Sequence, residues 1–517
     1  MHFPFLSIIV FTPLVAALII LLYKPDQKKA IRITALTAAL FALAMSLLVY
    51  FTYDKALAGY QFIEKYNWMP MLGISLHFGV DGMSAPLVLL TGIVMVTGVM
   101  ISWGVEDRPR EFFAFLFILA SGVFGVFASL DLFMLFFFYE IAVFPMYLLI
   151  SIWGWIKTRE YAAMKLTLYL FIGSVVSMIG ALVMYWNTGQ HTFDMLKISD
   201  AQQAGAFDFI VTTMHIPAIF VSWFHWPTLL PMSFQMVWFL PVFLGFAILG
   251  GIFPFHNWSP DGHVAAPTAV SMFHAGVLMK LGAFAALRVG IMLLPQGAHF
   301  WAPLIMGLAL VNIVYGAFIA SVQTDFKYVI GFSSVSHMGL VMMGFATLTP
   351  EGLTGAGVQM FSHGIMTALF FAAVGMVYDR AHTRQIPELG GMIKPLPLVG
   401  IGVIVGSLVS MGMPGFSGFV AEFPIFMGMW KSHWVVAVIA AISIVVTASY
   451  VLLVVRRVFF GKMPEALEGH IAPIRSLDKI ALVLLMTLMI GIGLFPALIV
   501  PWVQSGVQHI LALLGGA

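Results

Sequence analysis

The chain contains no cysteine and very little charge. Only 9% of its 517 residues are Asp, Glu, Lys or Arg, whereas 61% are hydrophobic. A typical soluble domain has roughly 25% charged residues, so this chain has too few to cover a water-exposed surface. The mean hydropathy of +1.01 agrees with this. The composition therefore predicts an integral membrane protein whose main solvent is the lipid bilayer.

The missing cysteines also limit the chemistry of the chain. Disulfides and cysteine-ligated iron–sulfur or zinc sites are excluded, and the 15 histidines show no HExxH or comparable spacing. No nucleophile triad or phosphate-binding loop is present, and a net charge of +2 gives no indication of nucleic acid as a partner. We therefore expect no cofactor and no metal in this chain.

Apolar runs of about 18 or more residues predict an all-α polytopic membrane protein with about fourteen spans. The first run has no basic residue before it and no A-x-A-like cleavage site, so we interpret it as a spanning helix rather than a signal peptide. The expected spans lie near residues 3–23, 30–50, 83–103, 112–129, 131–154, 162–187, 235–255, 267–294, 301–321, 328–348, 356–378, 397–428, 433–456 and 480–500.

The seventh and twelfth of these spans contain proline beside glycine. The seventh reads GGIFPFHNWSP around residue 254, and the twelfth reads SMGMPGFSGFV around residue 414. Proline removes a backbone donor and glycine loosens the turn, so each sequence predicts a broken helix. Broken helices in corresponding places, here five spans apart, are typical of transporters with internal repeats. Because five is an odd number, the two repeats would be inverted relative to each other.

The basic residues predict the orientation of the chain. Lys and Arg gather in the odd-numbered loops, whereas the opposite loops hold only Lys55, Lys65, Lys197 and Lys431. We therefore expect the odd-numbered loops in the cytoplasm and both termini on the other side, and the lack of a targeting peptide favours a bacterial cytoplasmic membrane. The connection 188–234 contains the sequence FVSWFHWPTLLP and is expected to lie at the membrane surface.

Three ionisable residues fall near the middle of predicted spans: Glu140 in FFFYEIAVF, Lys280 in AGVLMKLGAF and Glu422 in GFVAEFPIF. A charge at the centre of a spanning helix costs roughly 2.5–3.5 kcal/mol on insertion scales. These residues are either buried structural groups or members of a proton relay. A functional role is the default for intramembrane ionisable groups. Burial moves the pKa of carboxyl and ammonium groups toward neutral pH, which suits proton exchange.

Histidine and one further lysine extend the set of relay candidates. His337 and His363 lie in spans 10 and 11, and each is either a relay group or a hydrogen-bonded contact between helices. His274 lies six residues before Lys280, about 240° round an α-helix, so the two would not share one face. Lys327 opens span 10, either as a proton inlet or as a lysine that extends to the interface.

These residues lie in motifs that resemble the antiporter-like membrane subunits of respiratory complex I, a family related to subunits of Mrp-type sodium/proton antiporters. The motifs follow the family order from about residue 78 to residue 430. They are FGVDGMSAPLVLLT (78–91), FFFYEIAVFPMYLLISIWG (136–154), FPFHNWSPDGHVAAPTAVS (253–271) followed by HAGVLMKLGAF, QTDFKYVIGFSSVSHMG (323–339), FSHGIMTALFF (361–371) and MGMPGFSGFVAEF (411–423). Glutamate rather than lysine in GFVAEF is similar to the M-type (chain 4) members.

The resemblance implies a fourteen-helix fold with two inverted five-helix repeats and discontinuous helices 7 and 12. It implies that Glu140, Lys280 and Glu422 lie on one hydrophilic axis in the membrane. Partner subunits would hold flavin, iron–sulfur clusters and quinone, and L-type and N-type antiporter-like subunits would be the membrane neighbours. The expected segments are 1–110 (helices 1–3), 111–294 (first repeat, helices 4–8), 295–460 (second repeat, helices 9–13) and 461–517 (helix 14 and tail).

One position departs from the family pattern. The resemblance implies a lysine seven residues before the histidine of the FPFH motif, where it would pair with Glu140. Here FAILGGIFPFH places Leu249 at that position. Glu140 could then stay protonated, or it could pair with another basic residue. Alternatively, the subunit could pump protons poorly or along a changed route. We expect Lys165, on the next span, or hydrated His256, on the wall of a cavity at the first break, to replace the missing lysine.

The sequence predicts a proton-translocating subunit of a complex I-type quinone oxidoreductase. Because the chain has no redox centre, electron transfer in other subunits would drive it. A second hypothesis is an Mrp-type cation/proton antiporter subunit, which the lack of an added carboxylate cluster for sodium disfavours. A third is a structural membrane subunit, supported by Leu249 but opposed by the three costly charges that the chain retains.

Overall fold

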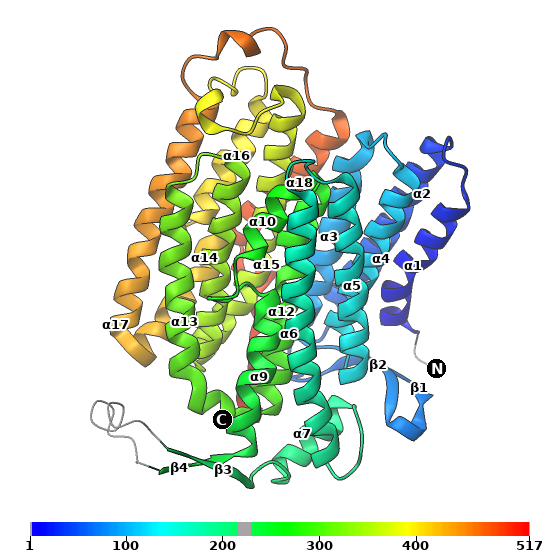
Figure 1. The fold of residues 1–517 in the computed structure, drawn as a ribbon, viewed down its shortest axis with the longest axis vertical. Helices are drawn as coiled ribbons and strands as arrows, with labels where there is room; N and C mark the ends of the chain where they lie inside the picture. The colour runs from blue at the N-terminus through cyan, green and yellow to red at the C-terminus, as the bar shows by residue number, and fades with distance from the viewer. Residues whose placement is uncertain (1–2, 216–228, 516–517) are drawn as a thin grey trace.

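The computed structural model describes residues 3–215 and 229–515, and its helices run side by side along the long axis of the molecule (Figure 1). Twelve helical segments in these residues are long and apolar enough to cross a membrane. They are α1 (Phe5–Leu22), α2 (Lys28–Thr52), α3 (Ser84–Ile101), α4 (Pro109–Ala128), α5 (Leu132–Trp153), α6 (Arg159–Asn187), the composite segment Thr268–Ile291, α13 (Pro295–Ser321), α14 (Phe326–Ala346), α15 (Pro350–Ala381), α17 (Ser417–Val454) and α18 (Ser476–Leu494).

The two spans predicted to break are shorter apolar helices in the structure. The seventh is α9 (Phe234–Leu249), followed after a loop by α10 (Trp258–Ala265). The twelfth consists of α16 (Pro397–Ser410) and the first part of α17, which kinks at His433 before continuing as the predicted thirteenth span. Both predicted interruptions are thus observed. The count of fourteen and the inverted repeat stay predictions, because α9 and α16 are each too short to cross the roughly 30 Å hydrocarbon core alone.

Both breaks are held by specific contacts. In the first, Gly251 has φ of +76°, a conformation that favours glycine. Asn312 of α13 accepts a hydrogen bond from the backbone N–H of Phe253 at 2.5 Å and donates one to the carbonyl of Gly251 at 2.8 Å. In the second, Gly412 has φ of +66°, and a Cβ there would lie 2.8 Å from Oε2 of Glu422. The freed backbone of the first break is therefore satisfied inside the protein.

The segment Thr268–Ile291, which carries Lys280, is not a uniform α-helix. It comprises α11 (Thr268–Phe273), the π-helical turn His274–Leu278, α12 (Met279–Ala285) and the π-helical turn Ala286–Ile291. Like α3 and α15 it is entirely buried, whereas α1, α2 and α6 bury less than half of their spanning windows. The Lys280 segment is therefore a central helix of the bundle.

Shorter elements lie outside the long helices. They include two antiparallel hairpins in connections where the sequence analysis predicts no strands. Part of the FVSWFHWPTLLP sequence, residues 220–228, lies outside the described residues. The shorter elements are β1 (Gln61–Met69) paired with β2 (Ile74–Val80), β3 (Ile210–His215) paired with β4 (Leu229–Ser233), α7 (Met195–Gln203) and α19 (Val500–Leu513).

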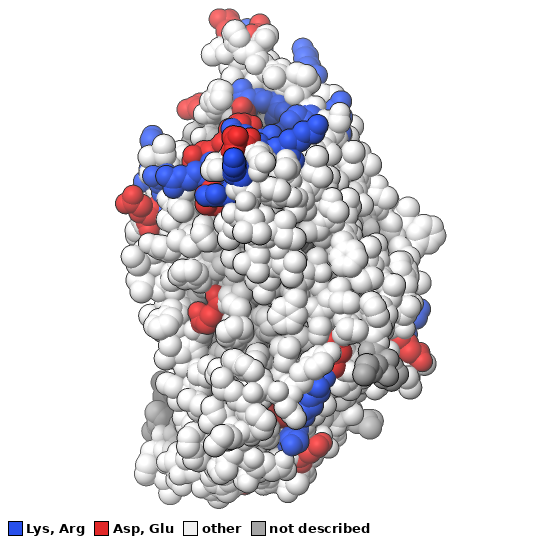
Figure 2. Space-filling model, turned by 90° about the vertical axis from the view of Figure 1, so that its right-hand side faces the viewer, with Lys and Arg blue, Asp and Glu red and all other residues white. Residues whose placement is uncertain are grey.

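Charged side chains gather at the two ends of the molecule. Figure 2 shows most Lys and Arg at the upper end, a smaller charged group near the lower end, and between them an almost uncharged band with one acidic patch. We call the upper end the basic end; its loops are 23–27, 105–108, 154–158, 322–325, 382–396 and 460–475. Ion pairs such as Arg32–Glu106 and Arg384–Asp325 join segments of this end. An uncharged band between charged ends matches a membrane-spanning protein.

The packing of the Lys280 segment against α9 generates the first prediction. A Cβ on Gly282 would lie 2.3 Å from the backbone nitrogen of Gly250 and 2.6 Å from the carbonyl oxygen of Phe246. Gly282→Val should therefore destabilise the protein by about 1–3 kcal/mol, because overpacking forces two backbones apart. Thermal unfolding of the purified protein in detergent measures this. Gly307→Ala on α13, with no atom within 4 Å of the added Cβ, should leave the melting temperature unchanged or higher. Equal melting of the Gly282 variant and the wild type would contradict the packing argument.

Candidate functional site

Lys280 is fully buried and has no acidic partner among the described residues. Its ammonium group donates to the backbone carbonyl of Ala275, within the first π-helical turn, and lies 2.8 Å from Nδ1 of His363 on α15. The wider π turn places that carbonyl where the side chain reaches it. π-helical turns occur often at functional sites, because they turn backbone groups away from the regular helix ladder.

From Lys280 a row of titratable side chains continues to Glu422. The ring of His363 lies 5.3 Å, centroid to centroid, from the ring of His337 on α14. His337 Nδ1 in turn lies 3.2 Å from Oε1 of Glu422 on α17. All four side chains are at least nine-tenths buried. The structure thus brings together four residues that the sequence analysis singles out, from four different helices, in one line.

Two uncharged side chains hold the Glu422 end of this row. Gln359 Nε2 of α15 lies 3.3 Å from both His337 Nδ1 and Glu422 Oε1. Ser410, the last residue of α16, has its hydroxyl 3.0 Å from His337 Nε2. Nδ1 of His337 therefore faces both the Glu422 carboxylate, which accepts, and the Gln359 amide, which donates, while Nε2 faces the Ser410 hydroxyl. Glu422 also lines a cavity of about 370 Å³ with Phe419, Phe423 and Trp430, so its row ends beside a lateral cavity of the molecule.

A second group of side chains approaches Lys280 from the basic end. The rings of His263 on α10 and His274 lie 3.9 Å apart, and His263 Nε2 lies 3.1 Å from the hydroxyl of Ser259. Both Lys280 and Lys327 are close enough for their charges to act on His263. The α-helical geometry assumed between His274 and Lys280 is wrong, because the π turn intervenes. The two side chains nevertheless have different partners, His274 stacking on Trp258 and His263.

Lys327 connects this group to a cavity at the basic end. Its ammonium group donates to the carbonyl of Ala266 at 2.8 Å and to the Ser271 hydroxyl at 3.4 Å. Ser271 in turn donates to the backbone carbonyl of His263 at 2.8 Å. Lys327 also lines a cavity of about 750 Å³ with Arg384, Asp379 and Trp155. Lys327 is buried and therefore lies on the wall of this cavity, rather than extending along a lipid-facing surface.

Glu140 stands apart from the row. It is exposed on the side of α5, between Phe137 and Phe144, which are 45% and 63% exposed. The neighbouring α6 places Ser174 near this carboxylate, and the Ser174 hydroxyl donates to the backbone carbonyl of Phe171 at 3.0 Å. The place expected for a lysine holds Leu249, which is fully buried. The Glu140 carboxyl group, near the middle of α5, thus forms no ion pair with a described residue of its own chain.

The two residues expected to replace the missing lysine have other surroundings. Lys165 forms an ion pair with Asp261 of α10 at 2.7 Å, and the Tyr328 hydroxyl donates to the same carboxylate at 3.0 Å. His256 is buried at the first break against Phe253 and Tyr315, and neither ring nitrogen has a partner among the described residues. The structure therefore does not bring Lys165 to Glu140.

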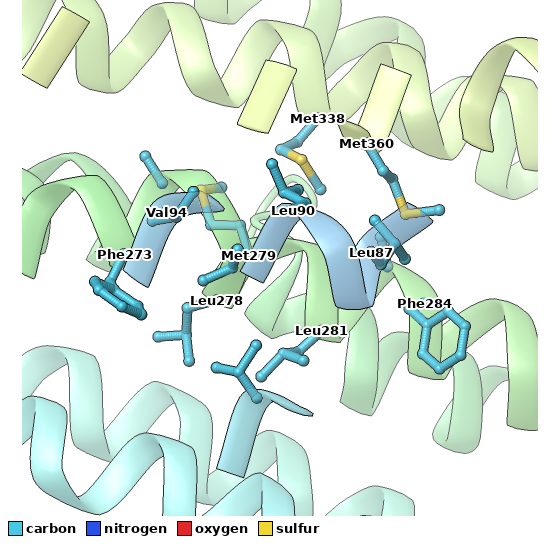
Figure 3. Close-up of a cluster of buried hydrophobic side chains, with 14 of the residues drawn as sticks. Leu87, Leu90, Val94, Phe273, Leu278, Met279, Leu281, Phe284, Met338 and Met360 are labelled. Carbon is cyan, nitrogen blue, oxygen red and sulfur yellow. The ribbon is translucent and has the colours of Figure 1, made fainter. Parts of the chain in front are cut away.

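Below Lys280 the same segment is packed in apolar side chains. Leu281 and Phe284 follow Lys280 in this direction, and Figure 3 shows them in one buried cluster with Leu87 and Leu90 of α3 and with Met338 and Met360. Further along, Arg288 forms a buried ion pair with Asp81 at 2.7 Å. Burial raises the pKa of Asp81, but the Arg288 guanidinium outweighs this and lowers it below its ordinary value. An apolar layer thus separates Lys280 from the ionised pair.

The chain was compared with protein families and with proteins of known sequence and structure. Residues 129–447 match the family model described as NADH:quinone oxidoreductase/Mrp antiporter, TM. The chain belongs to this family. It is 34% identical to NAD(P)H-quinone oxidoreductase chain 4 3 of Trichormus variabilis over 508 residues, which is 96% of this chain and 89% of the relative. It is 35% identical to NADH-quinone oxidoreductase subunit M of Rhodobacter capsulatus over 510 residues, 98% and 96% of the two chains.

Solved structures share the fold of this quinone oxidoreductase/Mrp family member. A chain of respiratory complex I from Thermus thermophilus superimposes with a TM-score of 0.86 at 24% identity, covering 99% of this chain and 100% of the other. A chain of the Mrp complex from a Dietzia species gives a TM-score of 0.82 at 19% identity, with both chains fully covered. The resemblance inferred from the motifs is thus confirmed at the level of family and fold.

The sequence analysis does not identify several residues of the site. His263 and Asp261 lie in the quoted motif SPDGHVAAP but carry no helical periodicity, because α10 follows directly on a break. Gln359 is uncharged, and only its position one turn before His363 on α15 could have pointed to it. The Asp81–Arg288 pair joins the motif FGVDGMS to the end of the Lys280 segment, a pairing that sequence spacing does not show.

The ion pair of Lys165 generates the second prediction. Lys165→Cys combined with Asp261→Cys should be joined by a short bis-maleimide, whereas Lys165→Cys combined with Glu140→Cys should not. Ser174, the residue of α6 near Glu140, lies nine residues beyond Lys165, or about 13 Å along α6. Mass spectrometry of the cross-linked peptides measures both yields, and the natural chain contributes no cysteine background. More efficient linkage of the Glu140 pair would show that Lys165 faces that carboxylate.

Proposed function

We propose that this chain is a proton-translocating membrane subunit of a complex I-type quinone oxidoreductase, and that Lys280, His363, His337 and Glu422 carry the proton. The observation that supports this most directly is their arrangement in one buried row with contacts of 2.8 and 3.2 Å at its two ends. Buried ionisable groups in a membrane protein mark proton or ion pathways far more often than they stabilise the fold.

The row suggests the order of proton movements. The Lys280 ammonium faces Nδ1 of His363, so His363 accepts there and releases its proton from Nε2, which has no protein partner among the described residues. The 5.3 Å between the His363 and His337 rings is a gap that one water or a small ring rotation bridges. His337 then donates from Nδ1 to Glu422, while Ser410 holds its other nitrogen.

We infer that protons reach Lys280 from the cavity at the basic end. Lys327 stands on its wall, Ser271 and the His263–His274 pair lie behind it, and the charges of both lysines act on His263. The concentration of Lys and Arg at this end supports its placement in the cytoplasm. Because the chain has no redox centre of its own, electron transfer in partner subunits would supply the energy through a change in the charge near the row.

The exposed position of Glu140 is evidence for a partner subunit that covers α5 and α6. A carboxylate at mid-depth facing lipid would pay a large desolvation cost, and no described cation of this chain offsets it. We propose that a neighbouring membrane-arm subunit, of the L-type or N-type, covers this face and presents a basic side chain to Glu140. In the family pattern a lysine of the same chain would pair with Glu140, but here that position is Leu249. A basic side chain of the neighbouring subunit would then take the place of that lysine beside Glu140.

The third prediction tests the row. Lys280→Ala should lower proton uptake into inverted membrane vesicles by roughly 10²-fold, the usual scale for loss of an acid–base group, and should lower coupled quinone reduction with it. Proton uptake and quinone reduction are measured in the same vesicles, with native electrophoresis to establish that the complex is assembled. Lys431→Ala is the matched control, because Lys431 is 54% exposed and pairs with Glu351 rather than with any member of the row.

Two results would contradict the proposal. Normal uptake by the assembled Lys280→Ala complex would make the lysine a structural group. Proton movement that follows an imposed sodium gradient and ignores quinone reduction would instead favour the Mrp-type antiporter.

The fourth prediction concerns Glu140. Glu140→Lys should weaken the hold of the neighbouring subunit, because like charges at a buried interface cost several kcal/mol, whereas Glu140→Gln should leave assembly intact. The measurement is subunit composition of the complex by native electrophoresis and peptide mass spectrometry. Glu160→Lys, an exposed carboxylate of α6 at the basic end, is the control and should assemble normally. Full assembly of Glu140→Lys would remove the cation proposed for the neighbour.

A further inference from the structure

A large apolar groove lies between the first two helices, away from the relay. Its volume is about 700 Å³, and its lining includes Thr12, Val15 and Ile19 of α1 and Ile33, Thr37 and Phe41 of α2. Figure 1 places α1 and α2 at the edge of the bundle. Val15, Ile19, Ile33 and Phe41 are each between 42% and 54% exposed, so large apolar side chains line an open groove rather than a closed core.

On α2 the groove is confined to the half of the helix nearest the basic end. Its lining there runs from Ile33 to Phe41, about 12 Å of a 25-residue helix, and on α1 it runs from Ser7 to Ile19. Half of a typical hydrocarbon core is about 15 Å thick. A partner helix that crosses the membrane would contact α2 along most of its length, whereas the lining of α2 stops at Phe41. The α2 side of the groove therefore matches an acyl chain of one leaflet better than it matches a transmembrane helix.

The cytoplasm-facing mouth of the groove carries an available cation. Lys29 precedes Ile33 by four residues, and Ile33, Thr37 and Phe41 follow at the same spacing, so all four lie on one stripe of α2. Lys29 is exposed and forms no ion pair with a described residue. Lys29 lies one helical turn before the groove, on the side of the basic end. A lipid whose acyl chain filled the groove would therefore have its headgroup beside Lys29.

The neighbouring charges leave Lys29 as that cation. Lys28 and Arg32 each hold a carboxylate oxygen of Glu106 at 2.6 Å. Their hydrogen bonds lower the pKa of Glu106 to about 2, so this carboxylate stays charged and occupies both of them. An excess of positive charge remains at the mouth of the groove. Basic groups beside intramembrane grooves on the cytoplasmic side are typical of sites for acidic phospholipids.

We propose that the α1–α2 groove binds an anionic phospholipid of the leaflet at the basic end, with an acyl chain along Ile33, Thr37 and Phe41 and its phosphate at Lys29. The proposal is independent of the relay, because none of its residues belongs to the Lys280–Glu422 row. The bound lipid would fill the space between α1 and α2, of which α1 packs on α4.

The test is native mass spectrometry of the intact complex, released from detergent after incubation with phosphatidylglycerol or with phosphatidylcholine of the same acyl chains. Lys29→Glu should lower retained phosphatidylglycerol about fivefold or more and leave phosphatidylcholine unchanged, since a lysine near the surface contributes about that factor. Thr37→Trp should lower the retention of both lipids, because the indole fills the groove from an exposed position. The matched controls are Lys394→Glu, an exposed lysine of another loop of the basic end, and Leu40→Trp, an exposed residue of α2 outside the groove.

The proposal is overturned if Lys29→Glu and Thr37→Trp retain both lipids like the wild type. It is overturned equally if a photo-cross-linker at Thr37 captures a protein subunit in native membranes, because a polypeptide would then occupy the groove. Loss of phosphatidylglycerol in Lys394→Glu to the same extent as in Lys29→Glu would reduce the effect to general surface charge and would also contradict a defined site. Proton uptake by Thr37→Trp is measured in parallel and should stay normal, so a failed lipid site leaves the proposed relay unaffected.

Discussion

The burial of the Lys280 ammonium without a carboxylate is the constraint around which the rest of the structure is organised. An ammonium group in an apolar interior needs acceptors, and here they are a backbone carbonyl and a histidine nitrogen. The carbonyl of Ala275 is available because the helix widens into a π turn, and the histidine is available because α15 packs directly against that turn. Close packing against α9 at Gly282 then fixes the depth of the lysine. The irregular helix is therefore part of how the charge is tolerated.

The two halves of the molecule treat their mid-depth glutamates differently. Glu422 lies inside the protein, with His337 and Gln359 beside it and a glycine at 412 that leaves room for its carboxylate. Glu140 lies on the surface, and the position that the family pattern gives to a lysine is a buried leucine. The Lys165–Asp261 pair in the same half is already neutral as a unit, so it has no net charge to offer Glu140. This asymmetry explains why the chain makes a complete row on one side and an open end on the other.

Most of the long helices and the four residues of the buried row can be found from the sequence, for a physical reason. A charge or a proline within an apolar run is rare, so Lys280, Glu422 and the breaks near residues 254 and 414 stand out without any structure. His337 and His363 follow because each lies in a long helix. His263 does not, because its place depends on the path of the chain after the first break. The pairing of Lys165 with Asp261 is not evident from the sequence for the same reason: Asp261 is distant in sequence and reaches α6 because the chain resumes as α10 after the break and continues toward the basic end. The π turns, which change the angular relation of His274 to Lys280, leave no trace in the residue pattern.

The side chains around Lys280 also differ between the two sides of the membrane. Toward the basic end the chain places Lys327, Ser271 and the two stacked histidines, with a cavity beyond them. Toward the other end it places Leu281 and Phe284, which belong to the apolar cluster of Figure 3, and then the Asp81–Arg288 pair. Protons move through polar groups and water and are stopped by dry apolar packing, so in the proposed relay a group placed between these two environments would exchange with one side of the membrane. The lateral row would then be the remaining route away from Lys280, and the direction of the proposed transfer would follow from packing as much as from the titratable groups themselves.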